Sequence, residues 1–209
     1  MHDPHEKQHG KGSGYSRRQF LKGSGVAVAA TAITGQVEGA VEESTATAHL
    51  YPAKANKITL KVNGKSHTVN VEPRETLVDV LRDHLNLTGC KEACDTNTCG
   101  SCTVIIDGNA IYSCSRLAVE CEGQEIRTVE SLQSSEKNDP LIDGFIKHDA
   151  LQCGFCTSGF VMATKAFLEK NPKASLEQIQ KGLGGNICRC GTYAGITKCA
   201  LELASKGRA

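Results

Sequence analysis

Cysteine spacing constrains this chain more than any other feature of its sequence. Eleven of the 209 residues are cysteine, well above ordinary usage. Eight of them fall into two groups of four, one with the spacing C-x4-C-x2-C followed by a later cysteine, the other combining C-x2-C with a distant C-x-C. The first group consists of Cys94, Cys99, Cys102 and Cys114, and the second of Cys153, Cys156, Cys188 and Cys190. Any fold of this chain has to gather each group around the species that it binds.

The spacing of the first group is typical of the plant-type [2Fe–2S] site. Four thiolates balance the charge of ferric iron there, and a short loop wraps around two irons and two sulfides. Gly100 and Ser101 are small, so we expect backbone N–H groups in this loop to point at the sulfurs and to stabilise the reduced cluster. Structural zinc sites use C-x2-4-C pairs separated by a longer loop, which is a poor match. Disulfides or inert buried thiols would also account for cysteines in this segment.

The second group is ambiguous by its spacing alone. Zinc and a [2Fe–2S] cluster fit the pattern about equally well, and a disulfide framework fits nearly as well. The cysteines lie at the ends of predicted helices. Free N–H groups and the positive end of the helix dipole favour thiolates and anionic clusters at such positions.

Residues 1–48 are predicted to be a twin-arginine signal peptide and leader. Paired arginines lie in the segment Ser16–Lys22, which is followed by the short, weakly apolar run GSGVAVAATAITG. This order is typical of a removable signal, and the pair resembles the twin-arginine export signal. The alternative is a basic tail with a chance Arg-Arg pair. Ala46-Thr47-Ala48 is the best cleavage site, so the mature chain is expected to begin near His49.

The twin-arginine route carries proteins that are already folded, often with their cofactors in place. Exported cysteines usually end as disulfides, because the compartments beyond the membrane are oxidising, but a cluster built in the cytosol can be exported intact. We expect the mature protein in the periplasm. We expect no membrane span, because no apolar run approaches the roughly 18–20 residues that a spanning helix needs.

Residues 56–131 are predicted to form a small α+β domain. Alternating apolar residues predict two hairpins, one turning at Asn63-Gly64 and the other at Asp107-Gly108. Between the hairpins, Thr76 is expected to cap a helix whose apolar positions continue to Leu85.

After a strand expected over Glu125 to Val129, the polar segment 133–140 is predicted to join two domains. The hydrophobic period then changes to that of helices, and residues 137–206 are predicted to form a four-helix bundle. Its helices are expected around Leu141–Ile146, over Thr157–Lys170, from the capping box of Ser175 and Gln178 onward, and over Tyr193–Ser205.

Composition and motifs argue against several other functions. The net charge is +1 and no basic stripe follows a predicted element, so nucleic-acid binding has little support. The chain has no G-x-G-x-x-G loop and no obvious acid–base constellation. We therefore expect no catalytic residue on this chain and no bond-making on a substrate.

Three segments, taken in this order, resemble the iron–sulfur subunit of the xanthine oxidase family of molybdenum hydroxylases. They are GCKEACDTNTCGSCTV, FIKHDALQCGFCTSGF and GNICRCGTY, and the resemblance covers about residues 56–206. It implies an N-terminal β-grasp, ferredoxin-like domain with a plant-type cluster. A C-terminal four-helix domain with a second [2Fe–2S] cluster would follow, nearer the molybdenum cofactor. With its leader, the chain looks like the small subunit of the periplasmic aldehyde oxidoreductase type.

The resemblance also implies roles and partners. The first group of cysteines would hold the first cluster and the second group the second, while Gln152 and Cys190 would lie against the pterin of a partner's molybdenum cofactor. The implied partners are a large molybdenum subunit and an FAD subunit or another electron acceptor. The chain would be the electron-relaying, non-substrate-binding subunit of an oxidoreductase. Two further hypotheses are a free-standing two-cluster carrier and a zinc- or disulfide-stabilised binding module.

Three cysteines, Cys90, Cys121 and Cys199, are left over. Counting Cys90 with the first group would give a spacing that fits no cluster pattern. We expect all three to be small buried or partly exposed residues, with a disulfide between two of them left open. His148 lies shortly before the second group. It is expected to be structural rather than a Rieske-type ligand, because both groups already have four thiols.

Overall fold

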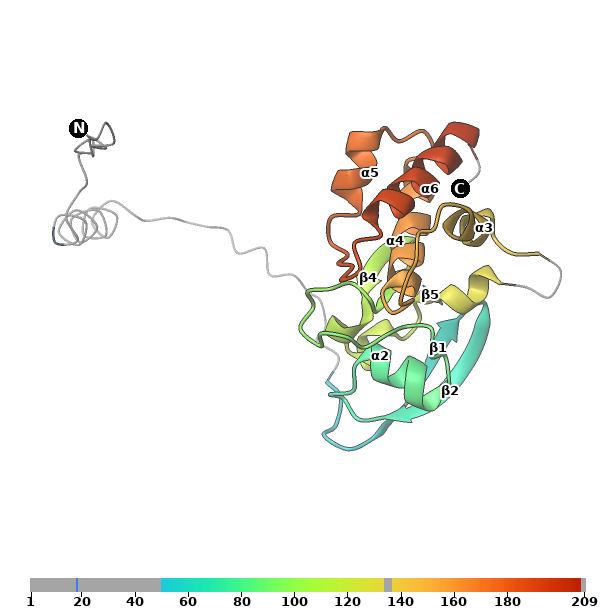
Figure 1. Ribbon diagram of the computed structural model, residues 1–209. Coiled ribbons are helices and arrows are strands. Elements are labelled where there is room, and N and C mark those ends of the chain that lie inside the picture. Colours follow the sequence, from blue (N-terminus) through green and yellow to red (C-terminus); the bar gives the residue numbers. More distant parts are fainter. Residues whose placement is uncertain (1–17, 19–49, 134–136, 208–209) are drawn as a thin grey trace, which may run out of the picture. The chain divides into compact units, whose positions relative to one another are not determined.

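The computed structural model describes residues 18, 50–133 and 137–207. The predicted signal peptide and leader, including the expected cleavage site, lie outside these residues apart from Arg18. The chain from His49 to Ala209 is one compact unit, with the strands of a sheet in one part and helices in the other (Figure 1). This mixture of sheet and helices confirms the coarse α+β prediction. The domain limits 56–131 and 137–206 remain predictions.

The sheet has five strands in the order β2-β1-β5-β3-β4. Strand β1 pairs antiparallel with β2 and parallel with β5, while β3 pairs antiparallel with both β4 and β5. The strands are β1 (Asn56–Val62), β2 (Lys65–Val71), β3 (Thr103–Ile106), β4 (Asn109–Tyr112) and β5 (Glu125–Arg127).

Both predicted hairpin turns are confirmed. Asn63 and Gly64 have φ values of 52° and 75°, and Asp107 and Gly108 have values of 48° and 77°. Two consecutive positive φ values give the two-residue turn whose twist matches that of the flanking strands. The second hairpin matters for function, because it leads the chain back from Cys102 to Cys114.

The predicted helix after Thr76 begins as expected but does not continue as one α-helix. Thr76 and Asp79 form the capping box of α2 (Leu77–Asp79), and the chain then continues as a π-helical segment, Val80–His84. The N–H of Leu85 donates to the carbonyl of Val80 rather than to that of Leu81. The apolar side chains of both segments, Leu77, Val78, Val80 and Leu81, are fully buried, so packing in the core overrides the regular helical period.

The last strand is shorter than predicted, ending at Arg127 instead of Val129. The N–H of Thr128 donates to the side-chain oxygen of Asn63 at 2.8 Å, and this bond replaces further strand pairing. The chain then turns into a 3-10 segment. The 3-10 segments are Ser113–Ser115, Ala118–Cys121 and Val129–Leu132.

The helical part follows the predicted pattern. Asp139 caps α3 through the N–H of Leu141, and Ser175 and Gln178 form the predicted capping box of α5. Gly207, with a φ of 59°, follows the last helix. The helices are α3 (Pro140–Lys147), α4 (Thr157–Lys170), α5 (Leu176–Gly182) and α6 (Tyr193–Lys206).

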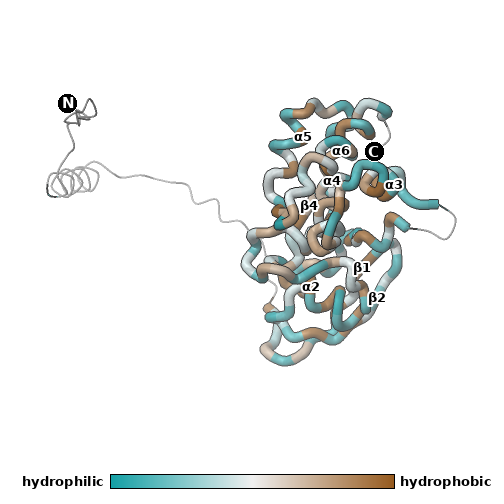
Figure 2. Tube along the Cα trace, viewed as in Figure 1, coloured by the Kyte–Doolittle hydropathy of each residue, from teal (hydrophilic) through white to brown (hydrophobic). Residues whose placement is uncertain are grey.

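Strand β3 lies between the two hydrophobic cores, and all four of its residues are buried. Val104 and Ile106 belong to the core of the sheet part, whereas Ile105 belongs to the core formed by the helices. Helix α4 packs against β3 and β4 on this side (Figure 1). Apolar segments accordingly run through the interior of both parts (Figure 2). Helix α4 therefore covers one face of the sheet at β3 and β4.

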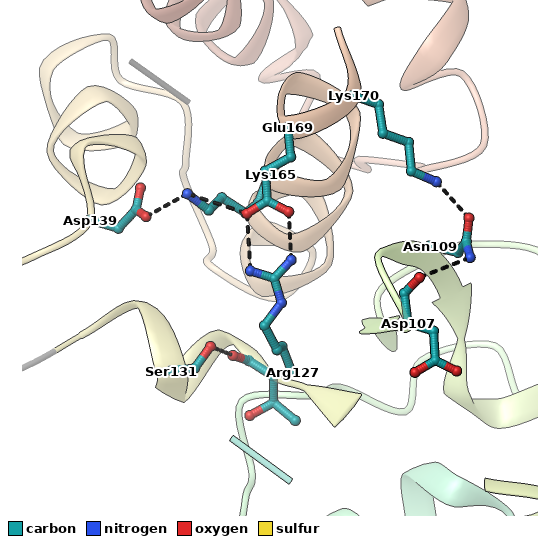
Figure 3. Close-up of polar contacts among 9 residues, drawn as sticks. Asp107, Asn109, Arg127, Ser131, Asp139, Lys165, Glu169 and Lys170 are labelled. Carbon is teal, nitrogen blue, oxygen red and sulfur yellow. Dashed lines mark hydrogen bonds and ion pairs between the residues drawn. The ribbon is translucent and has the colours of Figure 1, made fainter. Parts of the chain in front are cut away.

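Charged side chains also join the sheet to helix α4 (Figure 3). Arg127 on β5 makes two hydrogen bonds to the carboxylate of Glu169, at 3.0 and 2.5 Å. Lys165 lies 2.8 Å from Asp139 and 3.6 Å from Glu169. The hydrogen bond with Arg127 keeps the pKa of Glu169 below its usual value, so this carboxylate is ionised and shared between two cations.

Replacing Glu169 with glutamine is expected to lower the free energy of unfolding by about 1 kcal/mol. A bidentate Arg–carboxylate pair is stronger than an ordinary surface pair, but both side chains are 31% exposed and solvent screens them. Because the pKa of Glu169 is lowered on folding, its contribution is complete above its unfolded pKa and is lost as the pH falls through its folded pKa. Urea unfolding as a function of pH measures both effects.

Glu72→Gln is the control for this experiment. Glu72 lies 2.7 Å from Arg74, but these side chains are 48% and 86% exposed, so the change should be close to zero. Equal losses in the two variants would contradict a specific role for Glu169.

Candidate metal centres

The four cysteines of the first group lie on one loop and one hairpin. Cys102 immediately precedes β3 and Cys114 closely follows β4. The register of this hairpin pairs Thr103 with Tyr112, which brings Cys102 and Cys114 together at its open end. The N–H of Ser113 donates to the carbonyl of Cys102 at 3.2 Å. The structure therefore brings together cysteines that are twelve residues apart.

The loop from Cys94 to Cys102 bends through three residues with positive φ, namely Asp95, Asn97 and Gly100. Such conformations let successive N–H groups converge on one point and create a site for anions. Hydrogen bonds from the N–H groups of Thr96, Thr98 and Cys99, and from the thiol of Cys99, lower the pKa of Cys94 to about 6. The expectation that N–H groups point at a sulfur is met here, but the donors precede Gly100 and Ser101.

The first group is arranged as two pairs of thiols. Cys94 pairs with Cys99, and Cys102 pairs with Cys114, each pair through a contact between its side chains. Burial and the contact with Cys102 raise the pKa of Cys114 to about 12. Thiolates crowded in this way repel one another, so positive charge is required to keep all four ionised.

The second group is also arranged as two pairs. Cys156, at the N-cap of α4, contacts Cys188, and Cys153 contacts Cys190. The hydroxyl and N–H of Thr192 bond to the sulfur of Cys188, with the hydroxyl 3.2 Å away. Burial opposes ionisation, yet these bonds lower the pKa of Cys188 to about 7. Burial and the contact with Cys188 raise the pKa of Cys156 to about 12.

Pairing of the thiols bears on the kind of metal that fits. A structural zinc ion needs four ligands around one point, whereas a [2Fe–2S] cluster takes two ligands on each of two irons. Two pairs per group therefore fit a binuclear cluster better than zinc.

The two groups differ in their exposure to solvent. Cys153 is exposed, and so are its neighbours Leu151, Gln152 and Phe155. Leu151 and Phe155 are 40% and 48% exposed, although both side chains are large and apolar. The second group therefore lies at the surface on one side. The contact predicted for Gln152 and Cys190 with a partner's pterin remains a prediction.

Sequence reasoning missed the direct contact between the two groups. The N–H of Ile187, beside Cys188, donates to the carbonyl of Cys99 at 2.9 Å. The side-chain amide of Asn186 donates to the carbonyl of Gly100, also at 2.9 Å. The only signal in the sequence is a polar asparagine two residues before a cysteine, which does not reveal its partner.

The leftover cysteines are buried, as expected. Cys90, Cys121 and Cys199 are 3%, 0% and 0% exposed, and each has a free thiol. Burial raises the pKa of Cys90 to about 11 and that of Cys199 to about 12, which makes both thiols unreactive. His148 contacts the carboxylate of Glu202 at 2.5 Å, in agreement with a structural role.

Models of protein families match most of the compact unit. The 2Fe-2S iron-sulfur cluster binding domain matches residues 60–133, and the [2Fe-2S] binding domain matches residues 128–201. The twin-arginine translocation pathway signal sequence matches residues 14–34.

This chain also matches characterised proteins, and the alignments cover nearly the whole length of those relatives. The chain is 44% identical to the nicotine 6-hydroxylase small subunit of Paenarthrobacter nicotinovorans, over 72% of this chain and 91% of that subunit. It is 37% identical to the aldehyde oxidoreductase iron-sulfur-binding subunit PaoA of Escherichia coli, over 93% and 88% of the two chains. This chain is an iron–sulfur subunit of the xanthine oxidase family. As a member of that family it has two [2Fe–2S]-binding domains and serves an oxidoreductase of the aldehyde oxidoreductase and xanthine dehydrogenase type, as predicted.

Solved structures agree with this membership in the xanthine oxidase family. Quinoline 2-oxidoreductase from Pseudomonas putida 86 matches with a TM-score of 0.70 and 41% identity, over 75% of this chain and 99% of that one. Aldehyde oxidoreductase from Desulfovibrio gigas matches with a TM-score of 0.68 and 32% identity over 72% of this chain, but the match covers only 17% of that longer polypeptide. Helices in the described residues are too short or too polar to cross a membrane.

Proposed function

We propose that this chain relays electrons between a molybdenum centre on a partner subunit and a separate acceptor. The two [2Fe–2S] clusters supply reversible one-electron transfer. The chain's own residues hold the clusters, donate N–H groups to the sulfurs and set the distance between the two sites. The proposed ligands are Cys94, Cys99, Cys102 and Cys114 for one cluster, and Cys153, Cys156, Cys188 and Cys190 for the other.

The observation that carries the proposal is the hydrogen bond from the N–H of Ile187 to the carbonyl of Cys99, at 2.9 Å. It joins a proposed ligand of the first cluster to the neighbour of Cys188, a proposed ligand of the second. Two independent binding sites would not need this contact. A relay needs its two centres held at a constant short separation.

The thiol contacts suggest which cysteines share an iron. Cys94 and Cys99 would bind one iron of the first cluster, and Cys102 and Cys114 the other. In the second cluster the corresponding pairs would be Cys153 with Cys190 and Cys156 with Cys188.

The exposed surface around Cys153 is the proposed contact with a large molybdenum subunit. Leu151 and Phe155 supply apolar area there, and Gln152 and Cys190 would lie against the pterin. The longer Desulfovibrio polypeptide, of which this chain matches 17%, supports a larger functional unit. Similar small subunits occur in relatives that are named for nicotine, aldehydes and xanthine. This variety supports the proposal that the partner subunit selects the substrate.

The acceptor of the electrons would be an FAD subunit or another redox partner beside the first cluster. The twin-arginine match supports export of the folded subunit to the periplasm. A free-standing two-cluster carrier is the competing hypothesis. The exposed apolar residues beside Cys153 favour the complex, because an exposed apolar surface is commonly an interface.

Purification from the periplasm tests this function. The chain should co-purify with a large molybdenum-containing subunit, and anaerobic reduction of the complex should bleach a visible band with uptake of about one electron per [2Fe–2S] cluster. Adding substrate should reduce the clusters and bleach the same band. A fully loaded, active chain that never associates with a larger subunit would instead establish the free carrier.

A further inference from the structure

Asn186 belongs to the motif of the second group but bonds to the loop of the first. It lies two residues before Cys188 and is only 6% exposed. Its amide nitrogen donates to the carbonyl of Gly100 at 2.9 Å and lies 3.2 Å from the hydroxyl of Thr103. Both acceptors lie beside proposed ligands of the first cluster.

The absence of a side chain at Gly100 leaves room for the amide of Asn186. Its φ of 71° places it in the left-handed region, and a Cβ added there would lie 2.6 Å from the amide nitrogen of Asn186. Its carbonyl also accepts bonds from the hydroxyl of Thr103 at 2.6 Å and from the N–H of Thr103 at 3.1 Å. Three donors therefore hold the turn between Cys99 and Cys102, and one of them comes from the second motif.

We propose that Asn186 is a positioning residue for the first cluster and tunes its reduction potential. The inference rests on the proposed function, in which Cys99 and Cys102 bind that cluster. The amide directs the positive end of its dipole into a buried loop, where hydrogen bonds and dipoles act strongly. Hydrogen bonding around a cluster sets its potential. Without this donor, the partial negative charge on the carbonyl oxygen of Gly100 is less well balanced. Reduction of the first cluster, which adds an electron nearby, then becomes less favourable.

Asn186→Leu tests the proposal, because leucine has a similar size and no donor. We expect the midpoint potential of the first cluster to become more negative and its EPR signal to change. The second cluster should keep its potential and signal, although its proposed ligand Cys188 is only two residues from Asn186 along the chain. EPR-monitored redox titration of the loaded protein measures both clusters, once variants lacking one cluster have assigned the signals.

Thr103 and Thr192 provide matched comparisons. Thr103→Val removes another donor to the same carbonyl and should shift the same cluster in the same direction. Combined with Asn186→Leu, its effect should not be additive, since the two residues share one acceptor. Thr192→Val removes the hydroxyl beside the sulfur of Cys188 and should shift only the second cluster.

Several outcomes would decide against the proposal. An unchanged first cluster in Asn186→Leu, or a shift confined to the second cluster, would overturn it. If this variant does not load clusters, Asn186→Ala, which is smaller and has no donor, is titrated instead under the same criteria. A wild-type chain without iron and sulfide would refute the proposed function itself, which separates the two failures.

Discussion

Replacing Cys102 with alanine is expected to remove one cluster and leave the other in place. The wild-type chain should contain about four irons and four acid-labile sulfides, and the variant about half of each. Cys102 immediately precedes β3 and contacts Cys114, so its loss leaves one iron with a single protein ligand. The second group shares no cysteine with the first, and its EPR signal should therefore survive. Iron and sulfide analysis with EPR of the reduced protein measures the change.

Cys90→Ala is the matched control, because Cys90 and Cys102 are equally buried at 3% exposure. The thiol of Cys90 donates to the carbonyl of Cys102 at 3.1 Å, so the control also tests whether proximity alone matters. This variant should keep all of its iron. Full iron content in Cys102→Ala, or equal losses in both variants, would contradict the assignment of ligands.

Gly159→Ala is expected to disrupt the contact between helix α4 and the first cluster loop. A Cβ at this position would lie 2.2 Å from the carbonyl oxygen of Gly100 and 2.8 Å from the Cα of Ser101. Both are backbone atoms, so no side-chain rotation relieves the clash. We expect a net loss of about 1–3 kcal/mol in the free energy of unfolding, despite the gain of about 1 kcal/mol in helix propensity. Urea unfolding and the EPR signal of the first cluster report the change.

Gly184→Ala is the control for this substitution. Its added Cβ would approach the carbonyl oxygen of Lys181 no closer than 3.3 Å, and a small relaxation accommodates it. Stability and both EPR signals should stay near those of the wild type. If Gly159→Ala were as stable as this control and kept an unaltered first cluster, α4 would not constrain the loop.

Local features of the fold could be predicted from the sequence because their causes are local. Asn63-Gly64 and Asp107-Gly108 adopt positive φ values without help from distant residues. Thr76 and Ser175 cap helices through atoms three residues away. Cysteine spacing likewise predicts a loop short enough to wrap a binuclear cluster.

Other features depend on packing between distant segments. The π-helical turn after Asp79 and the early end of β5 at Arg127 follow from burial against the sheet and from a side-chain bond by Asn63. The run TVII has no alternation, and only the fold assigns Ile105 to one core and its neighbours to the other. No periodicity in the chain contains that information.

From the sequence alone, two sets of four thiols, the turns and caps around them, and an export signal ahead of them could be predicted. The contact between the two sets, in which Asn186 and Ile187 donate to the carbonyls of Gly100 and Cys99, became visible only in the folded chain. The reason is physical. Ligand spacing and turn conformation act over a few residues, whereas a hydrogen bond across 86 residues forms only when packing brings its partners together.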